Sequence, residues 1–236
     1  MSNIKKRILF CSESSHVKSG YGNYTRSILS RLYDTNKYEI AELSCYRTTS
    51  QPKDCPWKIY PNAVDKIDPR AEHYNANVNN QFGQWRFDIV VADFKPDIVI
   101  DFRDVFMTVF ERTSIFRNKF RLILAPTIDS FPIKHEWLDL LKNCDILLTH
   151  TDWAKNRIEQ EYGISVSGVV RDSIDYNIFR PKNTIACRMS AGLDMNAFII
   201  GSVMRNQKRK LRSYKKKYIT FHLCKYKKTS SSIRKW

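Results

Sequence analysis

A glycine-rich stretch between a short apolar run and a helical pattern is the first feature that could do chemistry. It reads Ser19-Gly-Tyr-Gly-Asn-Tyr-Thr-Arg26 and contains Gly20, Tyr21 and Gly22. Because glycine carries no Cβ, such residues let backbone N–H groups approach a phosphate or a sugar hydroxyl at the start of a helix. The alternative is that the glycines only allow a tight strand-to-helix turn. A dinucleotide site is the weaker interpretation, because Thr25 stands where that motif has its third glycine.

Polar side chains directly follow three further apolar runs, and each is a candidate for binding substrate: Arg103, Asp104, Asp129, His150 and Thr151. The carboxyl ends of parallel strands share one edge of a sheet, and open α/β sheets bind ligands there. Asp129 could bind sugar hydroxyls, with a turn or capping role as the alternative. Arg103 and Asp104 could instead form a surface ion pair, and His150 could be structural.

Apolar runs alternate with helical spacings along most of the chain, which predicts an α/β fold with a Rossmann-like, doubly wound parallel sheet covered on both faces. We expect strands at residues 7–11, 38–46, 97–102, 121–125, 145–149 and 166–170. Helices are expected up to residue 33 after an Asn23 cap, and at 82–94, 105–116, 135–142 and, capped by Asp152, up to 162. Residues 47–80 are expected to be irregular except for a short strand at 57–60. A turn-rich linker (175–183), a helix (184–191) and a strand (198–203) then suggest the start of a second α/β unit.

Most of the net charge of +16 belongs to one end of the 236-residue chain. Residues 205–236 hold 13 cations and no acid, whereas the preceding residues hold 27 cations and all 24 acids. The basicity therefore belongs to a segment that we expect to be a disordered tail, and not to a binding face. Such a tail supports at most salt-sensitive, unspecific binding of nucleic acid, and no specific nucleic-acid partner is expected.

The sequence has six cysteines, none at C-x-x-C spacing, and the longest apolar runs are too short to span a membrane. We expect reduced, mostly buried thiols, no metal site and no transmembrane segment. The basic and apolar start resembles a signal peptide, but the apolar run breaks at once into Glu13, His16 and Lys18. We interpret it as a buried first strand of a cytoplasmic protein, which leaves peripheral membrane contact open.

Six segments occur in an order that resembles the group 1 (family 4) retaining glycosyltransferases of GT-B fold, and one of them is Ala125-Pro-Thr-Ile-Asp-Ser130. The other five are the glycine-rich turn, Lys95-Pro-Asp-Ile-Val-Ile100, Cys144-Asp-Ile-Leu-Leu-Thr-His-Thr-Asp-Trp153, Asp172-Ser-Ile-Asp-Tyr-Asn-Ile-Phe-Arg-Pro181 and Gly201-Ser-Val-Met-Arg-Asn-Gln-Lys-Arg-Lys210. The resemblance covers roughly residues 5–210, with Ser173 standing where the family usually has glycine.

The resemblance implies a GT-B N-terminal, acceptor-side domain at residues 1–180. It also implies the start of a C-terminal, donor-side domain at 181–210, followed by the basic tail at 211–236. The implied activity is transfer of a sugar, hexosyltransferase-like and with retention, from a UDP- or GDP-linked donor to a sugar, lipid or protein acceptor. No cofactor is implied. No metal is implied either, and the chain has no D-x-D triplet.

The resemblance also implies roles for individual residues. Arg205 and Lys210 match the pair that neutralises the donor diphosphate, although this spacing could arise by chance in a basic stretch. Asp129 and His150 are the catalytic candidates. The substrate-binding candidates are Gly20, Tyr21, Gly22, Arg103, Asp129 and Thr151. Asp175 matches an aspartate at the crossing between the domains, where a structural role is expected.

The donor side lacks features that the family implies. No glutamate follows Glu161, and only about 55 residues follow Pro181, whereas a second α/β domain needs on the order of 100–150. Our hypothesis is a frameshift near codon 210, and reading the other two frames beyond that codon tests it. The second interpretation is a non-catalytic remnant or acceptor-binding module that lacks the donor domain.

Overall fold

The computed structural model describes residues 5–46 and 54–199 of the chain. The chain divides into two compact units, Met1–Ser173 and Ile174–Trp236, which are described separately.

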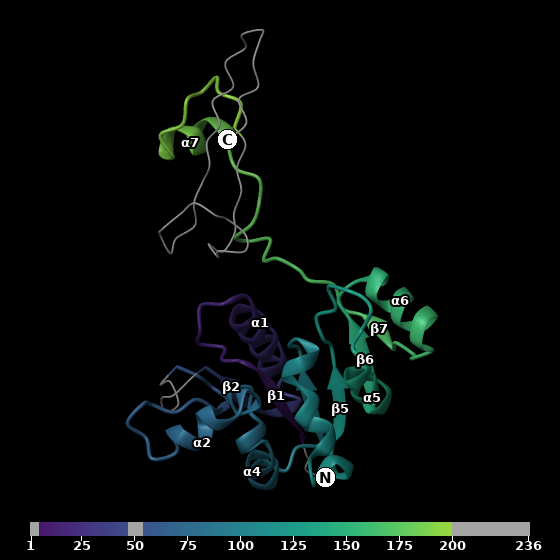
Figure 1. Cartoon of the computed structure of the whole chain (residues 1–236). Helices are drawn as coiled ribbons and strands as arrows, with labels where there is room; N and C mark the ends of the chain where they lie inside the picture. The colour runs from purple at the N-terminus through teal and green to yellow at the C-terminus, as the bar shows by residue number, and fades with distance from the viewer. Residues whose placement is uncertain (1–4, 47–53, 200–236) are drawn as a thin grey trace. The chain divides into compact units, whose positions relative to one another are not determined.

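The first unit is built on a seven-stranded parallel sheet (Figure 1). The strand order is β3-β2-β1-β4-β5-β6-β7, with every neighbouring pair parallel. This confirms the predicted Rossmann-like, doubly wound sheet. The strands are β1 (Lys6–Glu13), β2 (Tyr38–Cys45), β3 (Lys58–Pro61), β4 (Ile98–Asp101), β5 (Arg121–Leu124), β6 (Ile146–Thr149) and β7 (Gly168–Val169).

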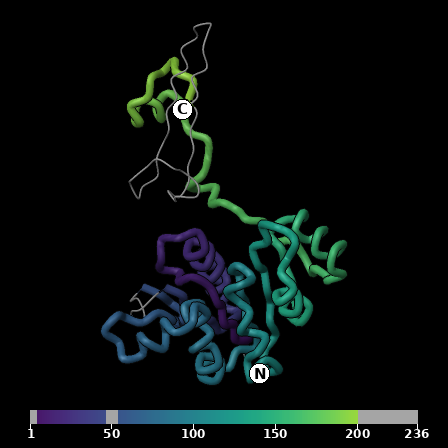
Figure 2. Tube along the Cα trace, in the orientation of Figure 1, coloured from purple at the N-terminus to yellow at the C-terminus, as the bar shows by residue number. Residues whose placement is uncertain are grey.

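Helices connect the strands. They are α1 (Gly20–Asp34), α2 (Ala71–Ala76), α3 (Val78–Gln81), α4 (Gln84–Phe94), α5 (His135–Asn143) and α6 (Asp152–Tyr162). The chain leaves β1 through α1 to β2 and β3, and then returns through α4 to β4 on the other side of β1 (Figure 2). This reversal of direction is the topological switch point of the sheet.

The two faces of the sheet bury different side chains of the same strand. On β1, Phe10 packs with Leu29 of α1, whereas Leu9 and Cys11 pack in the larger core that contains α4, α5 and α6. Successive side chains of a strand point to opposite faces, so a continuous apolar run buries both of its sides. This explains why the run at 7–11 reads as an uninterrupted hydrophobic segment.

One half of the α1-side face is covered less completely than the sequence predicts. In β4, β5 and β6 the buried positions alternate with half-buried ones, among them Ile100, Ile123 and Leu148. Ile100 and Leu148 pack against the smaller core around Leu29 and Phe102, and are only partly buried there. The expectation of full cover on both faces therefore holds for β1 and β2 and not for these three strands.

The structure corrects the expected caps of two helices. Ser19, and not Asn23, caps α1, because its hydroxyl oxygen accepts the N–H of Gly22 at 3.0 Å. Thr151, and not Asp152, caps α6 by accepting the N–H of Ala154 at 3.1 Å. Gly20, Tyr21 and Gly22 consequently form the first turn of α1.

The helix expected at 105–116 is replaced by two short 3-10 turns, and a third follows directly after this range. They are η1 (Val105–Met107), η2 (Val109–Thr113) and η3 (Arg117–Lys119). The hydroxyls of Thr108 and Thr113 donate to backbone carbonyls three residues back, at 3.0 Å each. Local bonds of this kind compete with the α-helical ladder, so tight turns replace a continuous helix. The segment expected to be irregular, 47–80, also contains α2 and much of α3.

In the second unit, α7 (Thr184–Ser190) follows an Asn183 cap, close to the helix predicted at 184–191. Asp175 ties a turn in the linker: its carbonyl accepts the N–H of Phe179 at 2.7 Å and its side chain accepts the N–H of Asn177 at 2.9 Å. The start of the predicted strand at 198–203 is irregular at Phe198, and residues 200–203 lie outside the described part of the chain.

Candidate functional site

The candidate site lies at the carboxyl edge of the sheet, around the switch point between β1 and β4. The loop after β1 leads into α1, and the loop after β4 leads into η1 on the other side of the sheet. Opposite chain directions leave a crevice between such loops, and the crevice is where doubly wound proteins bind ligands. All candidates before residue 174 lie at this edge, in the first turn of α1 or in the loops after β4, β5 and β6.

The two glycines at the start of α1 have different structural needs. A Cβ on Gly22 would lie 2.4 Å from the carbonyl oxygen of Val17 and 2.8 Å from that of Ser14, so packing alone requires glycine there. A Cβ on Gly20 would meet nothing within 4 Å, and this residue is exposed. Gly22 is therefore required by the packing of the turn between β1 and α1. Gly20 is not required by packing, and it leaves the backbone accessible to a ligand.

Tyr21 ties the first turn of α1 to the loops after β4 and β5. Its hydroxyl donates to Oδ1 of Asp104 at 3.0 Å and shares a 2.8 Å hydrogen bond with Oγ1 of Thr127. Burial raises the pKa of Tyr21, with the charge of Asp104 adding to this effect and the bond to Thr127 opposing it. The hydroxyl thus remains a neutral donor that spans the crevice. Sequence reasoning missed Thr127, because a lone threonine after a strand carries no distinctive pattern.

Arg103 is placed differently from the expectation. Its side chain is 0% exposed, so it forms neither a surface ion pair nor a freely accessible substrate contact. Its guanidinium donates to Asp101, to Sγ of Cys45 at 3.0 Å and to the carbonyl of Phe82. The cation anchors the loop after β4, because the residues that contact its guanidinium include members of β2, β4 and η2.

His150 links the ends of three strands. Its Nε2 lies 2.9 Å from the carbonyl oxygen of Ala125, and its Nδ1 lies 3.0 Å from Oδ1 of Asp172. The ring also lies edge-on to Tyr24 and Phe102, with centroids 6.2 and 6.0 Å away. With both nitrogens facing oxygen acceptors, the imidazole is held in place as a cross-link. This geometry favours the structural alternative over the catalytic one.

Asp129 and Thr151 are exposed at the same edge. The carboxylate of Asp129 accepts a hydrogen bond from the neighbouring Ser130 hydroxyl at 3.1 Å. The residue is exposed, so the carboxylate is open to solvent. Thr151 uses its hydroxyl oxygen as the α6 cap and retains its proton for donation. Asp129 is consequently the accessible carboxylate among the candidates. Arg205 and Lys210 lie outside the described residues.

Glu42 on β2 bears on the dinucleotide alternative, since an acid near the end of this strand is part of that site. The side chain is buried and accepts hydrogen bonds from the Ser15 N–H at 2.9 Å, the indole N–H of Trp57 at 3.0 Å and the Ser44 hydroxyl. It fixes the loop after β1. These three donors occupy the carboxylate, which leaves it unsuited to a ribose.

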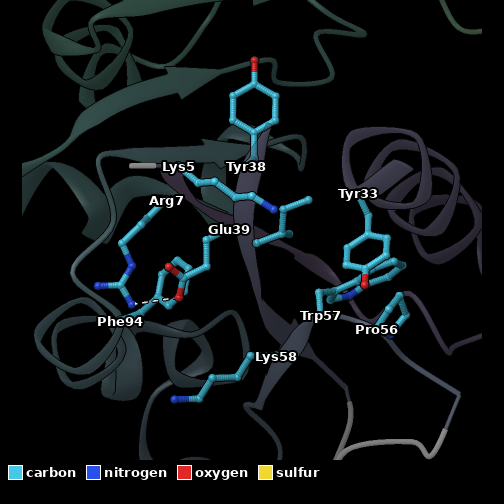
Figure 3. Close-up of a pocket in the computed structure, with 10 residues that line it drawn as sticks. Lys5, Arg7, Tyr33, Tyr38, Glu39, Pro56, Trp57, Lys58 and Phe94 are labelled. Atoms are coloured by element: carbon cyan, nitrogen blue, oxygen red, sulfur yellow. Dashed lines mark hydrogen bonds and ion pairs between the residues drawn. The ribbon is translucent and has the colours of Figure 1, made fainter. Parts of the chain in front are cut away.

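A groove lies at the opposite, amino edge of the sheet. It encloses about 630 Å³ at the starts of β1, β2 and β3 (Figure 3). Arg7 pairs with Glu39 at 3.1 Å and covers the Phe94 ring, while Lys58 pairs with Asp93 at 2.7 Å. These cations are already neutralised, so the groove offers less to an anion than its composition suggests.

In the described residues, no helix is both long and apolar enough to span a membrane. No family model matches the sequence, and no curated protein matches it. Among solved structures, the chain is similar to a sucrose-phosphate synthase from Thermosynechococcus elongatus, with a TM-score of 0.42 and 11% sequence identity. That match covers 80% of this chain and 96% of the other.

Proposed function

We propose that the chain is the acceptor-side part of a glycosyltransferase that takes a sugar from a UDP- or GDP-linked donor. The supporting observation is positional. The candidate residues before residue 174 lie at the carboxyl edge of a Rossmann-like sheet, in the first turn of α1 and in the loops after β4, β5 and β6. Residues 181–210 belong, in this proposal, to a donor-side domain.

In this proposal the acceptor lies at the carboxyl edge. Gly20 leaves the start of α1 open to a hydroxyl or phosphate, and the N-terminal end of a 15-residue helix favours negative charge. Asp129 accepts hydrogen bonds from acceptor hydroxyls, and Thr151 donates one. His150 acts as a positioning residue that holds the ends of β5, β6 and β7.

Arg205 and Lys210 neutralise the donor diphosphate in this proposal, because charge grows on the leaving group in the transition state. Titration calorimetry of the full chain with UDP-glucose and with GDP-mannose tests donor binding. We expect heat from one of these donors, and affinity about tenfold or more lower in Arg205→Ala and Lys210→Ala, the scale of a lost charge-assisted contact. Lys228→Ala, in the same basic segment, is the matched control and is expected to bind as the wild type does.

A second candidate function is a non-catalytic acceptor-binding module. The fixed His150 ring favours it, because this imidazole has no nitrogen free for proton transfer in the contacts described above. Absence of heat with both nucleotide-sugars, together with retained binding of glycosides, would support this candidate.

The Lys228→Ala control gives a third outcome of the donor titration. If this variant loses as much donor affinity as Arg205→Ala and Lys210→Ala, the donor binding is unspecific.

A further inference from the structure

Beneath the loop after β4, three ionisable side chains are buried together, and we call Asp101, Arg103 and Glu111 the buried triad. The side chains of all three are 0% exposed. Asp101 ends β4, Arg103 lies two residues beyond it, and Glu111 lies on η2. The proposed function uses none of the three directly.

Two members of the triad neutralise each other. Nε of Arg103 donates to Oδ1 and Oδ2 of Asp101 at 3.0 and 2.9 Å, and the backbone N–H of Arg103 donates to Oδ1 at 2.9 Å. A guanidinium fork that binds one carboxylate at several points is a fully compensated pair. Asp101 is therefore the carboxylate partner of this cation.

Glu111 has no comparable partner. Its Oε1 lies 3.7 Å from NH2 of Arg103, and neither carboxyl oxygen has a partner at hydrogen-bond geometry among the described residues, although Asp101 and Cys11 each have a ligand atom within 4.8 Å of the Glu111 carboxyl. If Glu111 were ionised, the triad would carry one unbalanced negative charge without access to water. A buried charge left unpaired is strongly unfavourable, so the group takes up a proton instead.

The remaining ionisable neighbours do not supply a compensating charge. Cys11 on β1 and Cys45 on β2 face the triad, and burial raises the pKa of both thiols, so they remain neutral. Burial opposes the charge of Arg103, but Asp101 and the other neighbours outweigh it and raise the pKa of the guanidinium. Burial, and then repulsion by Asp101, raises the pKa of Glu111 well above 4.5, with Arg103 opposing this.

We propose that Glu111 retains a proton at neutral pH, and that this buried proton fixes the loop after β4 at the switch point. The connection is direct, because the carbonyl of Arg103 accepts the N–H of Thr127 at 3.3 Å and Asp104 accepts from Tyr21. Loss of the proton places unbalanced charge under this loop and loosens the edge that carries the candidate site. The inference is independent of the proposed function.

The competing occupant is a divalent metal. Cys11, Asp101 and Glu111 each offer one ligand atom, and these atoms lie within 4.8 Å of one another. The cationic guanidinium bound to Asp101 repels a metal ion there, and protons neutralise the cluster without one. The two occupants can be distinguished by adding zinc, because only a metal site predicts that zinc raises the melting temperature of the wild type and not that of Glu111→Gln.

The test is the pH dependence of urea unfolding of the full chain, wild type against Glu111→Gln. A folded-state pKa above the unfolded value means that the folded protein binds more protons, so the stability contribution is present below pH 4.5 and is lost as pH rises through the folded pKa. The ratio of unfolding constants, wild type over variant, is expected to rise by up to tenfold per pH unit in that window. Glu136→Gln, an exposed acid on α5, is the control and is expected to show a constant ratio.

A measurement on the wild type keeps the proposal testable if Glu111→Gln fails to fold. With carbon-13 in the glutamate carboxyls, one resonance is expected to keep the chemical shift of a protonated acid at pH 7. The proposal is overturned if all the glutamate carboxyls of the folded protein are ionised at that pH, or if the unfolding ratio stays constant. It is also overturned if zinc added to chelator-treated wild type raises the melting temperature and leaves that of Glu111→Gln unchanged.

Discussion

Gly22→Ala is expected to destabilise the protein by roughly 1–3 kcal/mol or more, whereas Gly20→Ala is expected to be tolerated. The new Cβ at position 22 would lie 2.4 and 2.8 Å from two backbone oxygens, which cannot move without displacing the loop after β1. At position 20 the same Cβ meets open space, and alanine there lowers the entropy of the unfolded chain.

Urea unfolding of both variants measures this difference, and the pair also separates folding from binding. Gly20→Ala keeps the fold while adding a methyl group where a ligand would approach the backbone. Weaker ligand binding with unchanged stability would support the role proposed for Gly20. Equal loss of stability in the two variants would contradict the packing described for α1.

Arg103→Met is expected to lower the free energy of unfolding by about 3–5 kcal/mol, because it leaves Asp101 as a buried, uncompensated carboxylate. Arg112→Ala is the matched control. Arg112 pairs with Asp139 where the two side chains are 39% and 50% exposed, and its loss is expected to cost no more than about 1 kcal/mol.

A double variant separates the charge from the shape of the side chain. Adding Asp101→Asn to Arg103→Met removes the unpaired charge, so the double variant is expected to lose less stability than the sum of the single variants. Additive losses in urea unfolding would contradict the account of the buried triad. A change in ligand affinity without any loss of stability would restore Arg103 as a substrate-binding residue.

These two predictions also show which features of the fold could be predicted from the sequence and which could not. The run at 7–11 has enough consecutive apolar residues to be buried on both sides, and that local property predicts β1 correctly. The alternation of such runs with helical spacings likewise predicts the parallel sheet. The requirement for glycine at position 22 follows from carbonyl oxygens five and eight residues earlier, whose positions depend on how the loop after β1 folds.

The burial of Arg103 could not be predicted from the sequence, for a different reason. Its partners come from Cys45, Phe82 and Glu111, and arginine after a strand is usually exposed. The same holds for His150, since only the assembled sheet places Ala125 and Asp172 on either side of its ring. Sequence patterns report local periodicity, whereas burial of a charge is decided by residues far away in the chain.

The central claim is that the carboxyl edge of the sheet binds a sugar. Proton–nitrogen NMR of the full chain, titrated with methyl glucopyranoside and methyl mannopyranoside, tests it most directly. The account predicts shifts concentrated at Gly20, Tyr21, Asp129 and Thr151. Shifts concentrated instead at Lys5, Tyr38 and Lys58, which line the amino-edge groove, or no shifts with either glycoside, would contradict it.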